Sequence, residues 1–394
     1  MKELIVNVKD NVENIFLLED GELIEKYEDS NYKKRLEGNI YIGKVQNVIP
    51  GLQAAFVNVG ENKNAFIHLK DILPKNDSKE GNPLNNIEEF DIKKYVKVGM
   101  PLLVEIKRDA TCKKGSRAST HINIAGRYLV YMPNSTFITL SQKIEDEKER
   151  KRLYEIVEEF IPEGSGAIIR TSAIGKSKEE LQKDFNKLSE KWDKIVNTKF
   201  SEEDLPLLVH KTNDLLYKLL LDLVDFDLKK IYVNSKNLYD TIKEILKDLD
   251  VDNIEIVYKE KEDFSKLYNL QKQKEDAENR KIWLNCGGFI TIDKTEALTA
   301  IDVNSGKYIG KEKLEDTVFT VNKEASIEIA KQLRLRDIGG IIIIDYIDMH
   351  DDKNKENTIK ILEECIKKDR SRVQIEGFTK LNLLEITRKH ICSN

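Results

Sequence analysis

Two apolar segments in the C-terminal third of the chain each end on an aspartate. Residues 297–301 precede Asp302, and the four consecutive isoleucines at 341–344 precede Asp345. Four isoleucines in a row predict a strand buried on both faces, in the middle of a sheet covered by helices. Residues 317–335 have the spacing of an amphipathic helix, long enough to connect two parallel strands. The pattern therefore predicts two neighbouring parallel strands that present Asp302 and Asp345 to one crevice.

The rest of the chain alternates strand and helix patterns. Residues 1–36 contain two strand patterns around a turn at 19–22. Two strands alone are not stable, so we pair this segment with residues 214–280 as one discontinuous part. Further strands are predicted at 39–48, 52–59, 65–69, 98–107, 128–132, 166–171, 230–233, 253–258, 372–377 and 383–387. Helices are predicted at 145–160, 178–194, 215–224 and 238–249.

The composition is that of a soluble globular protein with several subdomains. Lysine and arginine number 65 and aspartate and glutamate 70, so the formal net charge is −5 and nucleic acid would be bound through local patches. The four cysteines are scattered without a C-x-x-C pair, which argues against a zinc knuckle or a redox motif and favours a reducing, cytoplasmic location. No apolar stretch approaches the roughly 20 residues of a membrane span.

The two aspartates are the strongest candidates for chemistry. An ionised carboxylate beside a buried strand is costly unless a cation or a donor meets it. Hard oxygen ligands suit Mg²⁺, which proteins usually hold through one or two carboxylates together with substrate phosphates. The alternative is that each aspartate caps the next helix or pairs with an arginine.

Residues 37–69 resemble the start of an S1 RNA-binding domain, one of the five-stranded OB barrels. Such barrels bind single strands by stacking bases on exposed aromatic side chains within a basic groove. Phe56 and Phe66 are candidates for this role, although a phenylalanine in a small barrel is often part of the core. A basic cluster nearby could contact phosphates; it consists of Lys107, Arg108, Lys113, Lys114 and Arg117.

Four longer motifs in the C-terminal part resemble the ribonuclease E/G family. They read GGFITIDKTEAL at 287–298, IDVNSG at 301–306, QLRLRDIGG at 332–340 and IDYIDM at 344–349. The members of this family are bacterial endoribonucleases that process ribosomal RNA and turn over messenger RNA. The S1-like unit precedes these motifs in the expected order, so the resemblance covers essentially the whole chain.

The resemblance implies an α/β fold with an inserted β-barrel. The barrel is an S1 (OB-fold) domain at residues 37–125, inserted in an RNase H-like subdomain made of residues 1–36 and 214–280. A 5′-phosphate sensor region follows at residues 126–213. A DNase I-like α/β catalytic subdomain occupies residues 281–394.

The resemblance also implies the role of individual residues. Asp302 and Asp345 correspond to the two aspartates that hold Mg²⁺, and Asn304 to the asparagine that supports them. The RNA-binding residues would be Phe56, Phe66 and Lys114. The pocket for a 5′-monophosphate would consist of Gly126, Val130, Arg170, Thr171 and Arg372.

The implied function is a Mg²⁺-dependent endoribonuclease that cleaves single-stranded RNA, including ribosomal RNA precursors and messenger RNA, to leave 5′-phosphate and 3′-hydroxyl ends. Mn²⁺ stays open as an alternative metal. Family members share a zinc ion between two chains through a cysteine pair, whereas this chain has only Cys392 near its end. The zinc link is therefore missing or lost by truncation, and homodimerisation through other surfaces stays open.

Two other functions are compatible with the residues. The first is a non-catalytic S1-type RNA-binding protein, and the second is a metal-dependent phosphodiesterase acting on DNA or small phosphoesters. Substitution of both aspartates would separate cleavage from binding, and competition between RNA and DNA would separate the two kinds of substrate.

Overall fold

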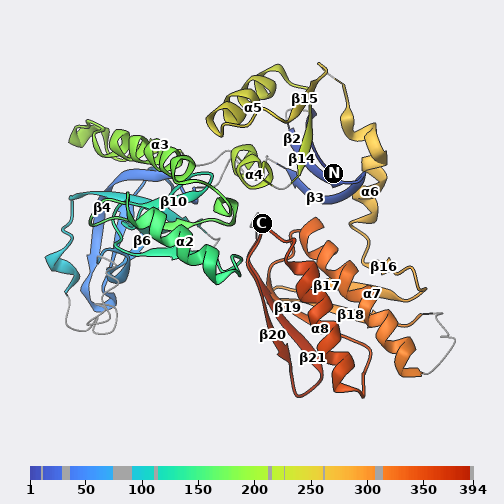
Figure 1. Ribbon diagram of the computed structural model, residues 1–394. Coiled ribbons are helices and arrows are strands. Elements are labelled where there is room, and N and C mark those ends of the chain that lie inside the picture. Colours follow the sequence, from blue (N-terminus) through green and yellow to red (C-terminus); the bar gives the residue numbers. More distant parts are fainter. Residues whose placement is uncertain are drawn as a thin grey trace. The chain divides into compact units, whose positions relative to one another are not determined.

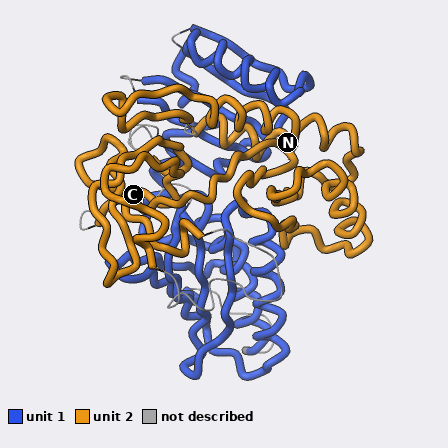
Figure 2. Tube along the Cα trace, turned by 90° about the vertical axis from the view of Figure 1, so that its left-hand side faces the viewer, with its two compact units in different colours: residues 1–32, 226–394 blue, residues 33–225 orange. Residues whose placement is uncertain are grey.

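A computed structural model describes residues 1–9, 12–28, 36–73, 91–110, 114–211, 215–225, 227–260, 262–306 and 314–390. The chain divides into two compact units (Figure 2). Unit 1 contains residues 1–32 and 226–394, and unit 2 contains residues 33–225. Within the described ranges, no helix combines the length and the apolar character that crossing a membrane requires.

Unit 2 begins with a closed five-stranded barrel. Strand β4 pairs along one edge with β5 and along the other with β7, so the order β4-β5-β6-β8-β7 returns to β4. The strands are β4 (Ile40–Ile49), β5 (Ala54–Asn58), β6 (Ala65–His68), β7 (Pro101–Arg108) and β8 (Arg117–Ser119), with β13 (Leu207–His210) added beside β4. The mixed α/β fold with an OB-like barrel expected from the sequence is therefore confirmed.

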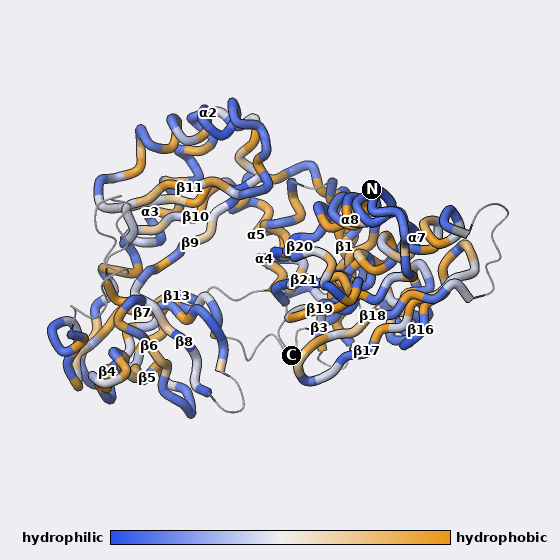
Figure 3. The backbone as a smooth tube through the Cα atoms, turned by 90° about the horizontal axis from the view of Figure 1, so that it is seen from below, coloured by the Kyte–Doolittle hydropathy of each residue, from blue (hydrophilic) through white to orange (hydrophobic). Residues whose placement is uncertain are grey.

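A four-stranded sheet with helices completes unit 2 (Figure 1). Its order is β11-β12-β10-β9, and helix α3 packs on β10. Apolar residues concentrate in strands such as β10, whereas α2 is mostly hydrophilic (Figure 3). The elements are β9 (Ile124–Ala125), β10 (Leu129–Met132), β11 (Ile138–Leu140), α2 (Glu147–Glu158), β12 (Gly166–Ile169), α3 (Lys178–Val196) and α4 (Leu215–Leu223).

The first sheet of unit 1 joins the N-terminal segment to a distant part of the chain. Its order is β15-β14-β1-β2-β3, and β1 runs parallel to β14. This pairing supplies the partner that the N-terminal strands need for stability. The elements are β1 (Lys2–Lys9), β2 (Val12–Glu19), β3 (Glu22–Glu28), β14 (Leu228–Val233), α5 (Lys236–Asp248), β15 (Glu255–Tyr258) and α6 (Leu270–Asp276).

The second sheet of unit 1 carries the two acid-ended strands. Its order is β16-β17-β18-β19-β21-β20, and the crossover helix α7 makes β18 and β19 parallel, as predicted. Helix α8 was not predicted from the sequence. The elements are β16 (Lys281–Trp283), β17 (Phe289–Lys294), β18 (Leu298–Asn304), α7 (Leu314–Leu335), β19 (Gly340–Asp345), α8 (Asp352–Ile366), β20 (Val373–Phe378) and β21 (Leu383–Arg388).

Short 3-10 helices connect several of these elements. They are η1 (Pro50–Leu52), η2 (Leu69–Asp71), η4 (Ile92–Lys94), η5 (Thr171–Ala173), η6 (Glu202–Asp204) and η7 (Phe264–Asn269).

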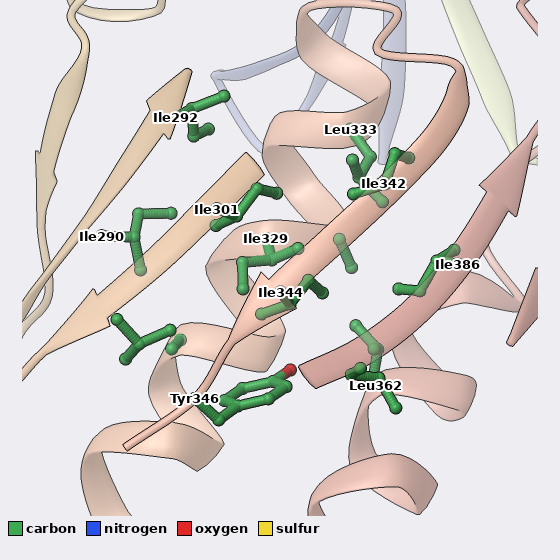
Figure 4. Packing of buried hydrophobic residues seen from close by; sticks show 14 of the residues in the cluster. Ile290, Ile292, Ile301, Ile329, Leu333, Ile342, Ile344, Tyr346, Leu362 and Ile386 are labelled. Carbon is green, nitrogen blue, oxygen red and sulfur yellow. The ribbon is translucent and has the colours of Figure 1, made fainter. Parts of the chain in front are cut away.

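Among the described residues of unit 1, helices cover one face of the second sheet, which corrects the prediction that the isoleucine run is buried on both faces. Ile342 and Ile344 are fully buried against α7 and α8, where Ile329 and Leu362 meet them (Figure 4). In contrast, Ile341 is 51% exposed. The alternation of buried and exposed positions along β17, β18 and β21 is the same, so the opposite face of this sheet is available to solvent.

Within unit 1, a buried arginine fastens the end of β21 to the connections on either side. The side chain of Arg388 is fully buried; it donates to Asp369 at 2.7 Å, to Asp337 at 2.8 Å and to the carbonyl of Ile338 at 3.0 Å. A buried guanidinium is tolerated only when its donors are satisfied in this way. The contact joins the end of β21 to the segments that precede β19 and β20.

Replacing neighbouring isoleucines of β19 tests the one-sided burial. We expect Ile342→Ala to lower the free energy of unfolding by about 2–5 kcal/mol, because it leaves a cavity under α7. Ile341→Ala, on the exposed face of the same strand, should change it by less than about 1 kcal/mol. Urea denaturation of the two variants gives both values, and equal losses would mean that both faces are covered.

Candidate active site

The carboxylates of Asp302 and Asp345 lie side by side on the exposed face of this sheet. The two residues are direct partners in the parallel pairing of β18 with β19, and both side chains are exposed. Ile301 and Ile344, which precede them, point into the core. The juxtaposition predicted from the sequence is thus confirmed, and the register of two strands produces it.

The amide of Asn304 and the carboxylate of Asp348 lie near the two aspartates. The Nδ2 atom of Asn304 donates a hydrogen bond of 2.7 Å to Oδ2 of Asp302. Partial burial and the negative charges of Asp302 and Asp348 raise the pKa of Asp345 above its ordinary value of 3.8. Neighbouring carboxylates disfavour each other's ionisation, so the site attracts a cation.

Among the described residues, no lysine or arginine forms an ion pair with Asp302 or Asp345. The guanidinium of Arg280, which interacts electrostatically with Asp302, is held by Asp293 through hydrogen bonds of 2.5 and 2.6 Å. The alternative in which each aspartate pairs with an arginine therefore does not hold within this part of the chain. Two exposed carboxylates with an adjacent amide suit a hard divalent cation that keeps several waters.

A larger ligand cluster does not form around the pair. Within the ranges given above, no three histidine, cysteine, aspartate or glutamate side chains converge as a metal site. Mg²⁺ is commonly bound by one or two carboxylates together with water and substrate phosphates. The donor set of Asp302, Asp345 and Asn304 fits this mode better than it fits a structural zinc, which requires four ligands of nitrogen or sulfur type.

The predicted RNA-binding phenylalanines lie on the outside of the barrel. Phe56 and Phe66 are direct partners on β5 and β6, and their rings meet edge to face with centroids 5.7 Å apart. Both are partly exposed, whereas Val57 and Ile67 beside them are fully buried in the barrel core. The reading of both phenylalanines as core residues is therefore wrong.

The basic cluster near them is only partly available to a phosphate. Lys107 forms an ion pair of 2.6 Å with Glu105, and Arg117 forms one of 2.9 Å with Asp71. Lys114 is exposed, and Lys113 lies outside the described residues. Lys114 is thus open to solvent, whereas Lys107 and Arg117 are partly buried.

Three of the predicted 5′-phosphate residues meet in unit 2. Arg170 follows β12 and donates at 3.0 Å to the carbonyl of Gly126; Thr171 follows it in the chain. The other end of its guanidinium is bound by the carboxylate of Asp222 on α4. A phosphate at Arg170 would share or replace that carboxylate.

Asp184 is a buried acid beside Gly126 that sequence reasoning missed. It lies on α3 and accepts hydrogen bonds from the backbone amides of Tyr128 and Leu129 at 2.8 and 3.0 Å. A Cβ atom added to Gly126 would lie 2.8 Å from Oδ2 of Asp184, so only glycine fits there. The sequence does contain a signal for this buried acid. Asp184 lies three residues after Leu181 and so falls on the apolar face of the helix.

The remaining two pocket residues are less closely tied to this group. Val130 lies on β10 and is half-buried, opposite Ile168 of β12. Arg372 belongs to unit 1, whereas the other four residues belong to unit 2. The pocket of five residues stays a prediction.

Comparison with known proteins gives the class of this chain. The model of the Ribonuclease E/G family matches residues 123–391. Ribonuclease G of Salmonella typhimurium is 36% identical over 389 residues, which cover 98% of this chain and 79% of that protein. Ribonuclease G of Haemophilus influenzae gives the same values, and ribonuclease E of Haemophilus influenzae is 34% identical over 99% of this chain and 42% of its own length. The chain therefore belongs to the ribonuclease E/G family.

Substitution of one aspartate tests the charge coupling of the pair. Because like charge contributes to the raised pKa of Asp345, Asp302→Asn should lower that pKa toward 3.8. A carboxyl group whose pKa is raised in the folded state lowers the free energy of unfolding at pH values above that pKa, and this effect disappears below the pKa of the unfolded chain. The variant should therefore be more stable than the wild type at pH 7. Carboxyl NMR titration and urea denaturation measure these effects, with Asp240→Asn on α5 as an unaffected control. An unchanged pKa of Asp345 would contradict the coupling.

Proposed function

We propose that this protein is a divalent-metal-dependent endoribonuclease that cleaves single-stranded RNA to leave 5′-phosphate and 3′-hydroxyl ends. Membership of the ribonuclease E/G family supports the class of enzyme. The observation that carries the proposal is the adjacent carboxylate pair, Asp302 and Asp345, on an exposed sheet face. A non-catalytic RNA-binding protein would have no use for such a charge concentration.

The chain's own residues divide the chemical work. When bound, a divalent cation supplies Lewis acidity and a water of lowered pKa for attack on the phosphodiester. Asp302 and Asp345 would hold that cation, Mg²⁺ in our proposal. Asn304 orients the Asp302 carboxylate through its 2.7 Å hydrogen bond and does not act as a base, because an amide does not titrate in water.

The barrel supports a single-stranded substrate. Partly exposed aromatic side chains such as Phe56 and Phe66 accept stacked bases regardless of sequence, and Lys114 can contact phosphate. We propose that this S1-type surface binds the RNA, and that Arg170, with Gly126 and Thr171 beside it, binds a 5′-monophosphate. A guanidinium matches phosphate oxygens well, although Asp222 must then give up part of its contact.

The wider setting follows from the same proposal. We propose that the protein acts in the cytoplasm, in ribosomal RNA processing and messenger RNA decay. We also propose that the chain has the domain boundaries given under Sequence analysis. Homodimerisation stays part of the proposal, and we propose no zinc link. Cys392 lies outside the described residues.

Loss of the carboxylates tests the reaction. Asp302→Asn and Asp345→Asn should each lower the cleavage of a labelled single-stranded oligoribonucleotide by at least about 100-fold, because the cation loses a ligand. RNA affinity should change little, since the barrel is untouched. Product ends mapped with and without Mg²⁺ should be 5′-phosphate and 3′-hydroxyl.

A matched control is Asp293→Asn, which removes a carboxylate of the same sheet face that is already paired with Arg280. It should retain cleavage within a few-fold of the wild-type rate. A wild-type protein that binds RNA but never cuts it would favour the RNA-binding alternative. Preference for single-stranded DNA in competition would favour the phosphodiesterase alternative.

Substitution of Arg170 tests the 5′-phosphate pocket. Arg170→Ala should reduce cleavage of a 5′-monophosphorylated substrate by about 10-fold, the effect of one lost charge-assisted contact, and leave the 5′-hydroxyl substrate nearly unchanged. Comparing the two substrates removes any general effect on folding. Equal losses on both would contradict a role in 5′-end recognition.

A further inference from the structure

An exposed aromatic pair lies on the same sheet face as the carboxylates. Trp283 on β16 is 57% exposed, and its ring meets Phe289 of β17 with centroids 5.3 Å apart. The ammonium of Lys281 lies 4.1 Å from the Trp283 ring centroid and 3.6 Å from that of Phe289. Solvent-exposed tryptophan is uncommon, so this cluster calls for a functional explanation.

Strand register places this cluster next to the active site. Trp283 pairs with Phe289, and Phe289 pairs with Asn304 on β18. In the adjacent row, Lys281 pairs with Thr291, and Thr291 pairs with Asp302. Direct partners in antiparallel strands point to the same face. The backbone of Trp283 is therefore two strand spacings, about 10 Å, from that of Asn304 on β18, the strand that also carries Asp302.

Packing does not explain why these rings are on the surface. The intervening residue Ile282 packs against the core cluster, and Ile290 and Val303 are buried in it. Trp283 and Phe289 alternate with these residues and so point away from the core. Their aromatic faces are not required to fill the interior of unit 1.

Charge makes the cluster complementary to a nucleic acid. No carboxylate among the described residues forms an ion pair with Lys281, and its ammonium is held against two rings by cation–π attraction. The aromatic faces suit a nucleobase, and the ammonium suits the phosphate that follows it. The carboxylate pair alone would repel RNA, so a cationic and aromatic flank is what a bound strand needs there.

We propose that Trp283 and Phe289 form a stacking platform for a nucleobase of the substrate beside the scissile phosphate, with Lys281 facing the backbone. This inference rests on the proposed function. The platform is separate from Phe56 and Phe66, which belong to the barrel of unit 2. It positions one nucleotide relative to Asp302 and Asp345, and it accepts any base because every base has a π face.

The first test is an abasic scan of a single-stranded oligoribonucleotide with one cleavage site. In the wild type, removal of the base at one position flanking the cut should lower kcat/KM by about 5- to 100-fold, the effect expected for one stacked base. Trp283→Ala should show a similar loss on the intact substrate and no further loss at that position. Trp283→Phe should restore most of the rate, because it keeps an aromatic face.

Tyr154→Ala is the control, because Tyr154 is an exposed aromatic residue on α2 in the other unit. It should leave the abasic profile unchanged. If Trp283→Ala cuts the intact substrate at the wild-type rate with the same abasic profile, the platform is refuted while the nuclease stands. If the wild type does not cut at all, the proposed function itself fails.

The second test reads binding without cleavage. The chain has two tryptophans, and in an Asp302→Asn, Asp345→Asn protein the addition of single-stranded RNA should quench the fluorescence of Trp283. Introducing Trp283→Phe into that protein should remove the quenching, leaving only any signal of Trp192. Quenching that is the same with and without Trp283 would overturn the inference, whatever the activity of the wild type.

Discussion

The parallel pairing of β18 with β19 is the constraint on which the site depends. It sets Asp302 opposite Asp345, although 43 positions of chain separate them (345 − 302). A shift of register by one residue would turn one carboxylate toward α7 and place a charge in the core. The buried isoleucines that alternate with the acids prevent such a shift. The same contacts that stabilise the core therefore fix the geometry of the chemistry.

Leaving one sheet face open has an electrostatic consequence. Two carboxylates on an exposed face retain part of their hydration and can exchange water for a cation and a phosphate. Partial burial and the negative charges of Asp302 and Asp348 disfavour the ionised form of Asp345, as its raised pKa indicates. Functional sites commonly carry such local costs, which the rest of the fold offsets. In this unit, the apolar core beneath β18 and β19, which includes Ile301, Ile342 and Ile344, supplies that offset.

Several arginines of unit 2 are already paired with aspartates of the same unit. Asp222 holds Arg170, Asp225 holds Arg127 at 2.7 Å, and Asp71 holds Arg117. A strand-end arginine identified in the sequence is thus a charge already shared with a protein acid. Binding of an anionic substrate would have to compete with these partners, because each carboxylate lowers the net positive charge that its arginine presents.

The sequence by itself determined most of the helices and strands, the crossover that makes β18 and β19 parallel and the aspartate pair, because these follow from local periodicity. The barrel was expected from the resemblance to S1 domains, and helix α8 was missed. Tertiary structure decided which face of the isoleucine strand is covered, since a continuous apolar run looks the same whether one or both faces are buried. It also decided the partners of Arg170 and the close approach of Asp184 to Gly126. The cross-strand pairing that brings Trp283 and Asn304 into one row was likewise decided there. Such contacts depend on which strands and helices meet, and that information is not local.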